Sequence, residues 1–192
     1  MTDNELINII ATQLELAVAN AGWDYKVIQK NDPQQEGIPS EPGIFFEKLF
    51  DHPYGFPIIN NTYNSVPDNF SETNLQVYET TFQVTSLVIQ NPDDLTIPTA
   101  SDAANQMLMF MQSRTTVAAL RALGVSLLRI TQVRNPYFVD DRNRFEGHPN
   151  FDIIVYSKRE ITFTVPAAVK AVGAPSPVPP GAPGSGVFPV LE

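Results

Sequence analysis

Residues 75–90, LQVYETTFQVTSLVIQ, alternate in a way that predicts one long β-strand. A second alternating run occupies residues 151–165 and predicts another long strand. On the first strand, one face would carry Tyr78, Phe82, Val84 and Val88, and the other Val77, Thr81, Thr85, Leu87 and Ile89. On the second strand, Phe151, Ile153 and Val155 would share a face, opposite Asp152, Ile154 and Tyr156.

Segments with helical periodicity flank these strands. Residues 4–21 predict an amphipathic helix, with Asp3 as its N-cap and Gly22 as its end. Thr99 and Asp102 have the spacing of a capping box, so a second helix is expected to run to about residue 111. The apolar stripe of the first helix comprises Leu6, Ile7, Ile10, Leu14, Ala17 and Val18.

Shorter elements complete the predicted order. A third helix is expected over residues 115–123, closed by Gly124, and short strands over residues 23–28, 43–50 and 125–133. This order of helices and strands predicts an α+β fold, with a mainly antiparallel sheet and helices packed on one face.

Three stretches are predicted to be irregular. Residues 52–74 contain Pro, Asn and Gly throughout and predict a long loop, and residues 135–149 predict a charged loop. Residues 167–192 are rich in Pro, Ala and Gly and predict an extended C-terminal arm. The sequence therefore predicts one domain over residues 1–166, followed by an arm that either reaches a neighbouring molecule or has no partner.

Composition excludes several classes of protein. The formal net charge is −9, with only 12 Lys and Arg residues scattered along the chain, which disfavours tight DNA binding. No cysteine is present, so disulfides, thiolate nucleophiles and Cys-ligated zinc are excluded. The acidic N-terminus lacks the features of a signal peptide, and no apolar run reaches the roughly 20 residues that a membrane span requires. We expect a soluble protein, made in the cytoplasm, with no membrane partner.

The candidate catalytic cluster lies in and beside the charged loop. It comprises Asp140, Asp141, Glu146, His148 and Asp152. Carboxylates and a histidine can bind a metal, but the spacing Glu146-x-His148 matches no tight zinc motif. The expectation is a solvated loop, or a loop that pairs with a neighbouring subunit, and no metal or cofactor. His52 lies in a loop-like context without a nucleophile elbow, so no enzymatic activity is predicted. A small metal-dependent hydrolase is the alternative reading of this cluster.

Two stretches carry a resemblance to one known family. The run TASDAANQMLMFMQS at residues 99–113, followed by VAALRALGV at residues 117–125, resembles the helical hairpin of the neck and tail-terminator (gateway) family of tailed phages. The run RFEGHPNFD at residues 144–152, leading into the last long strand, resembles the segment in which an aromatic and an acidic residue precede Phe-Asp. The resemblance covers about residues 4–165 and implies a tail-terminator-like fold.

The resemblance implies a structural role in the neck of the virion. Such proteins form rings, usually hexameric, around the DNA channel, next to a head-completion or collar ring and to tail tube or sheath proteins. The family has no catalytic residues, and double-stranded DNA would pass through without tight binding. A soluble tail-assembly or scaffold factor that binds partners transiently is the alternative. The candidate interface residues are Phe188, Val190, Leu191, Asp140, Asp141 and Glu146, and the acidic residues expected to face the lumen or a neighbour are Asp93 and Asp94.

Overall fold

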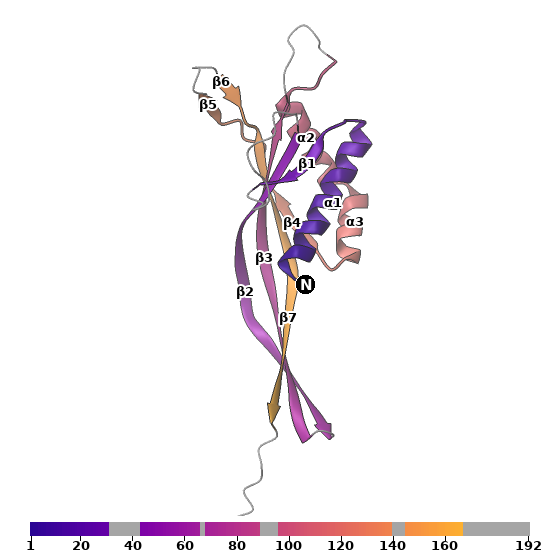
Figure 1. The fold of residues 1–192 in the computed structure, drawn as a ribbon, viewed down its shortest axis with the longest axis vertical. Helices are drawn as coiled ribbons and strands as arrows, with labels where there is room; N and C mark the ends of the chain where they lie inside the picture. Colours follow the sequence, from indigo (N-terminus) through magenta and orange to yellow (C-terminus); the bar gives the residue numbers. More distant parts are fainter. Residues whose placement is uncertain (31–42, 66–67, 89–95, 140–144, 167–192) are drawn as a thin grey trace, which may run out of the picture.

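The computed structural model describes residues 1–30, 43–65, 68–88, 96–139 and 145–166, and Figure 1 shows their arrangement. Three helices stand beside the upper part of a sheet whose longest strands continue well below them. In chain order the elements are α1 (Asp3–Ala21), β1 (Lys26–Gln29), β2 (Gly43–Ser65), β3 (Asp68–Leu87), α2 (Ala100–Met111), α3 (Arg114–Ala122), β4 (Ser126–Ile130), β5 (Tyr137–Val139), β6 (Phe145–Gly147) and β7 (Asn150–Pro166).

The main sheet has the strand order β1-β2-β3-β7-β4. β1 runs parallel to β2, whereas the other three pairings are antiparallel. The predicted α+β class with a mainly antiparallel sheet is therefore confirmed. Both long strands predicted from alternation are present, and they pair with each other as β3 and β7 at the centre of the sheet. β5 and β6 form a separate small hairpin.

The helices begin and end at local signals in the sequence. The α1 cap is Thr2 rather than the predicted Asp3, because Thr2 and Glu5 form a capping box that satisfies two backbone N–H groups. α2 starts at the predicted box of Thr99 and Asp102. Gly124, with φ of 79°, allows the left-handed turn that follows α3, a conformation that side chains with a Cβ rarely adopt.

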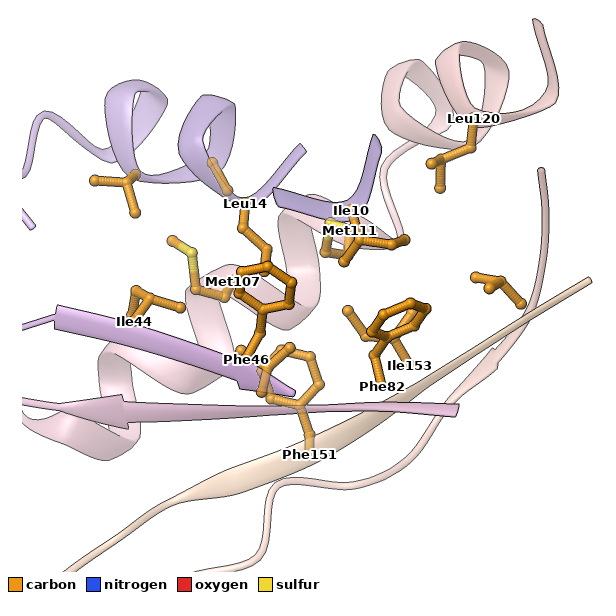
Figure 2. Close-up of a cluster of buried hydrophobic side chains, with 14 of the residues drawn as sticks. Ile10, Leu14, Ile44, Phe46, Phe82, Met107, Met111, Leu120, Phe151 and Ile153 are labelled. Carbon is orange, nitrogen blue, oxygen red and sulfur yellow. The ribbon is translucent and has the colours of Figure 1, made fainter. Parts of the chain in front are cut away.

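The core lies between the helices and the upper part of the sheet. Figure 2 shows side chains from α1, α2 and α3 meeting those of β2, β3 and β7. Fully buried side chains of this kind each stabilise the fold by about 1.5–3 kcal/mol relative to leaving them exposed. The largest of them include Leu6, Ile10, Leu14, Ile44, Phe82, Met107, Met111, Leu120, Phe151 and Ile153.

The predicted loop over residues 52–74 is wrong. These residues form the lower parts of β2 and β3, which pair from Ser65 and Asp68 upward, with a register shift between Tyr54 and Ile58. Pro, Asn and Gly disfavour strands intrinsically, but cross-strand pairing overrides such weak local preferences. Along β3, β7 pairs on the opposite side, so the irregular-looking segment lies within a three-stranded sheet. The predicted loop over residues 135–149 likewise contains the β5–β6 hairpin.

The lower part of the sheet projects beyond the helices (Figure 1). It consists of residues 52–65 of β2, 68–79 of β3 and 157–166 of β7, and we call it the extension. β1 pairs with β2 only up to Phe46, and β4 pairs with β7 only up to Tyr156. Within the described ranges, both outer edges of the extension therefore have no strand partner.

Candidate assembly surface

One face of the extension carries exposed apolar side chains next to three polar ones, Asn61, Glu72 and Asn74, and no other described element covers it. Residues paired across a sheet share a face, and every second residue of a strand returns to it. The side of β3 that buries Phe82 in the core therefore continues downward to Phe70. Two rows of paired residues cross the three strands there: Tyr63, Phe70 and Val165 form one, and Ile59, Asn74 and Ile161 form the other. We call the exposed apolar residues of this face the apolar belt: Ile59 (58% exposed), Tyr63 (55%), Phe70 (38%), Ile161 (58%), Phe163 (50%) and Val165 (40%).

The apolar belt differs in kind from isolated surface hydrophobics. Four of its members are adjacent, because Phe70 pairs with Tyr63 on one side and with Val165 on the other, and Phe163 is the next residue of β7 on this face. The ring centroids of Tyr63 and Phe70 lie 5.2 Å apart. Contiguous exposed apolar surface on a protein commonly marks a site that a partner covers. The helices cover the same face only in the upper part of the sheet, so the belt has no cover among the described residues (Figure 1).

The opposite face of the extension is mostly polar near its end. Thr73 and Thr162 are adjacent, with 3.2 Å between their hydroxyl oxygens. Asn64 donates from its side-chain nitrogen to Ser71 Oγ at 2.8 Å and to Asn69 Oδ1 at 3.1 Å. The two faces therefore differ near the end of the extension, where hydrogen-bonding side chains predominate on one face and the apolar belt lies on the other.

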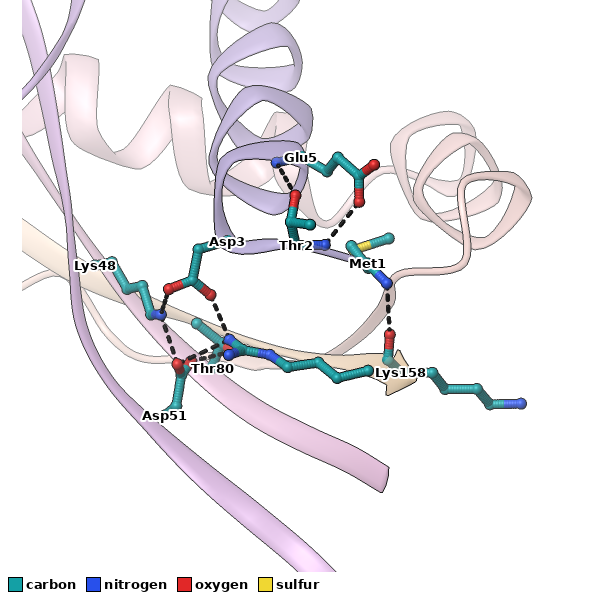
Figure 3. A network of polar contacts seen from close by, with 9 residues as sticks. Met1, Thr2, Asp3, Glu5, Lys48, Asp51, Thr80 and Lys158 are labelled. Atoms are coloured by element: carbon teal, nitrogen blue, oxygen red, sulfur yellow. Dashed lines mark hydrogen bonds and ion pairs between the residues drawn. The ribbon is translucent and has the colours of Figure 1, made fainter. Parts of the chain in front are cut away.

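An ionic cluster lies where the extension leaves the helices, and Figure 3 shows it. Lys48 Nζ is 2.7 Å from Asp3 Oδ2 and 2.5 Å from Asp51 Oδ2. Arg159 bridges the same two carboxylates, and its distance to Asp51 Oδ2 is 2.8 Å. Because Asp3 lies in α1, Asp51 in β2 and Arg159 in β7, the cluster ties the first helix to two strands of the extension. We call these four residues the ionic clamp.

The surroundings of the clamp shift two protonation equilibria. Partial burial by itself would raise the pKa of Asp51, but hydrogen bonds from Lys48 and Thr80 and the charges of Arg159 and Lys48 outweigh it and lower that pKa. Partial burial would lower the pKa of Lys48, but its hydrogen bonds to Asp3 and Asp51 and the charges of both carboxylates raise it overall. Both groups are thus held in their charged forms. The guanidinium of Arg159 also lies 4.5 Å from the centre of the Tyr78 ring.

Most of the interface residues predicted from the sequence lie outside the described ranges. These are Asp93, Asp94, Asp140, Asp141, Phe188, Val190 and Leu191. Glu146 lies in β6, where its backbone pairs with that of Phe138.

The candidate catalytic cluster is only partly described. Asp152, its C-terminal member, lies in β7, where it pairs with Arg134 at 2.7 Å and accepts a hydrogen bond from Gln83. The ranges that the structure describes hold no group of three or more potential metal ligands.

Sequence reasoning missed the apolar belt and the ionic clamp. Alternation of apolar and polar residues from Ile161 to Val165 was the available signal for the belt on β7, whereas residues 59–63 of β2 do not alternate. The clamp had no local signal, since Asp3, Lys48 and Arg159 are brought together only by the fold.

Comparison with known proteins places the chain in a family. Residues 5–167 match the family described as E217 gateway protein gp29. No curated protein sequence matches. One similar solved structure is described as the PVC sheath/tube terminator in the extended state, from an extracellular contractile injection system. It has 13% sequence identity and a TM-score of 0.48, and the match covers 100% of this chain but 65% of that one, so this chain spans less than two thirds of its length.

None of the helices in the described part of the chain has the length and apolarity that a membrane crossing requires.

The family match extends over nearly the whole of the described α+β domain, from α1 to the end of β7. The chain therefore belongs to the E217 gateway protein gp29 family, a family of structural phage proteins and not of enzymes.

Proposed function

We propose that this chain forms a closed hexameric ring in the neck of a tailed-phage particle. The ring would join the head-completion or portal side to the tail tube and leave a channel through which double-stranded DNA passes. Its neighbours would be a head-completion or collar ring on one side and tail tube or sheath proteins on the other. Membership of the gateway family supports this proposal.

The observation that carries the proposal is the uncovered extension. A free monomer would expose the apolar belt and two unpaired strand edges to water, and natural monomers avoid such surfaces. A ring offers every copy the same two neighbours, because one pair of complementary patches per subunit generates a closed cycle. Assembly would therefore cover these surfaces on all copies at once.

The charge of the chain suits a channel that does not hold DNA. Tight binding to duplex requires clustered Lys and Arg that release counterions, whereas this chain carries a net charge of −9. We infer that the channel wall is neutral to acidic and repels the phosphate backbone weakly. The acidic residues that we propose face the lumen or a neighbouring subunit are Asp93, Asp94, Asp140, Asp141 and Glu146.

The C-terminal arm is proposed as a second connection. Residues 174–186 would extend roughly 40 Å in polyproline II conformation, at about 3.1 Å per residue. The arm ends in the apolar residues Val187, Phe188, Val190 and Leu191, which suit an anchor on an adjacent subunit or the next ring. Proline lowers the conformational entropy that such an arm loses when it docks.

An electron cryomicroscopy reconstruction of the neck in purified particles tests this function. The expected result is a closed ring of this chain between the head and the tail tube, with a continuous axial channel. A single copy or an open filament would refute the ring. Absence of the chain from mature particles that nonetheless require it for assembly would favour the alternative, a transient tail-assembly or scaffold factor.

A further inference from the structure

We propose that neighbouring copies in this ring join edge to edge through the extension. Residues 58–65 of β2 in one copy would pair with residues 159–165 of β7 in the next copy. The inference rests on the proposed ring and names the surface that closes it. The belts of neighbouring copies would then adjoin one another around the ring.

The two edges are open over stretches of similar length. Pro53 and Pro57 deprive the upper part of the β2 edge of backbone donors, so its proline-free part begins at Ile58. On β7, the amino group of Met1 donates to the carbonyl oxygen of Lys158 at 3.1 Å, and Pro166 ends the strand. The open stretch of β7 therefore runs from residue 159 to 165, where each backbone group on the outer edge can accept a partner strand.

The two open edges also lie at the same level of the extension. Asn74 of β3 pairs with Ile59 on one side and with Ile161 on the other, and Phe70 pairs likewise with Tyr63 and Val165. A rotation about an axis roughly along the strands keeps each level in place. It therefore brings β7 of one copy beside β2 of the next with their open stretches matched.

The direction of the strands determines the type of junction. β2 and β7 are both antiparallel to β3, so they run the same way. Copies related by such a rotation would meet in a parallel pair, which can form evenly spaced hydrogen bonds. The junction uses a different edge from each copy, so it is heterologous and can close only as a ring or continue as a filament.

Side chains at the junction favour contact between copies. Residues 58–65 of β2 and residues 161–165 of β7 carry no charged side chain. The two charged residues of the β7 stretch, Arg159 and Glu160, lie at its upper end, and Arg159 is held by the ionic clamp. Most of the junction therefore lacks the charges that commonly block edge pairing. Pairing at matched level would place Ile59 beside Ile161 of the next copy, and Tyr63 beside Val165 of the next copy. The exposed halves of these side chains would then cover one another.

Disulfide trapping tests the junction, because the chain has no native cysteine. Asn60 and Thr162 are exposed and share one row through Thr73, on the face opposite the belt. Within one copy they are two strand spacings apart, about 9.5 Å, beyond the roughly 7 Å that a disulfide can span. The double variant Asn60→Cys/Thr162→Cys can therefore be linked along this row only between copies.

The experiment uses particles assembled with the full-length variant under reducing conditions, then oxidised and denatured without reductant. We expect a ladder of covalent multimers that ends at the ring size. Each single-cysteine variant should give no ladder, because a heterologous junction never brings identical residues together. The double variant Asn60→Cys/Lys158→Cys is the register control. Lys158 is exposed on the same face as Thr162, but it lies four residues, about 13 Å, farther up β7.

A second matched pair, Thr62→Cys/Thr164→Cys, repeats the measurement two residues along the strands. Particles that contain the ring but yield no ladder from either matched pair would overturn the edge junction while leaving the ring intact. A ladder from the register control as strong as that from the matched pairs would overturn the proposed level. A chain that is missing from the neck would instead overturn the proposed function.

Discussion

Replacing Asp51 by Asn tests whether the ionic clamp stabilises the attachment of the extension to the helices. The substitution keeps the shape of the side chain and removes its charge. Asp51 accepts contacts from Lys48 at 2.5 Å, from Arg159 at 2.8 Å and from the hydroxyl of Thr80 at 2.7 Å. The Thr80 hydroxyl can still donate to the amide oxygen of Asn, so the loss falls on the two charged contacts.

The magnitude follows from the partial exposure of these groups. The side chains of Lys48, Asp51 and Arg159 are 19%, 20% and 27% exposed, so solvent screens their attraction only in part. Each charged contact then stabilises the fold by about 1 kcal/mol. This value lies between the contribution of an exposed ion pair and that of a buried hydrogen bond to a charged group. We expect Asp51→Asn to lower the free energy of unfolding by about 2 kcal/mol, which corresponds to a fall in Tm of about 4–8 °C for a chain of this size.

The effect should depend on pH in a defined direction. Because the folded-state pKa of Asp51 is lowered, its contribution is present above its unfolded pKa of about 3.9 and is lost as pH falls through the folded value. Because the pKa of Lys48 is raised, its contribution is present below about pH 10.4 and is lost as pH rises through the folded value. The difference between wild type and variant should therefore be largest between about pH 4 and pH 10.

Urea unfolding followed by circular dichroism measures the difference. Asp24→Asn is the matched control, because it removes an equal charge from an exposed side chain outside the clamp. It should change stability by less than about 0.5 kcal/mol. If Asp51→Asn is as stable as Asp24→Asn at pH 7, the clamp contributes nothing and the reasoning is refuted.

Three further outcomes are expected. Phe82 is 0% exposed, so Phe82→Ala should lower the free energy of unfolding by about 3–5 kcal/mol in the same assay. Phe56 is 95% exposed, so Phe56→Ala should change it by less than about 0.5 kcal/mol. Equal losses would contradict the placement of the core. Deleting residues 174–192 should leave the thermal melt of the domain nearly unchanged, while attachment of the tail to the head fails or weakens. Replacing Phe188 and Leu191 by Ser should reproduce much of that defect. Normal particle assembly by the deletion variant would refute the proposed role of the arm. Binding to duplex DNA at about 150 mM salt should be weak or undetectable in a mobility-shift titration, and submicromolar affinity would refute a non-gripping channel.

Sequence alone determined the elements whose signals are local. Alternation along residues 75–90 predicted the central strand, which the structure describes as β3 up to Leu87, and the box of Thr99 and Asp102 predicted the start of α2. These signals are readable because a strand repeats every second residue and a helix cap involves groups three residues apart. The absence of enzyme motifs and the family resemblance followed from the same local patterns.

Tertiary structure decided the rest. Residues 52–65 look irregular by composition, yet they form a strand because β3 supplies a partner along nearly their whole length. The ionic clamp joins Asp3 to Arg159 across most of the described chain. The apolar belt combines Ile59, Phe70 and Ile161 from three strands. Pairing register and long-range contacts are non-local, so no window of sequence contains both partners, and only the folded sheet brings them onto one surface.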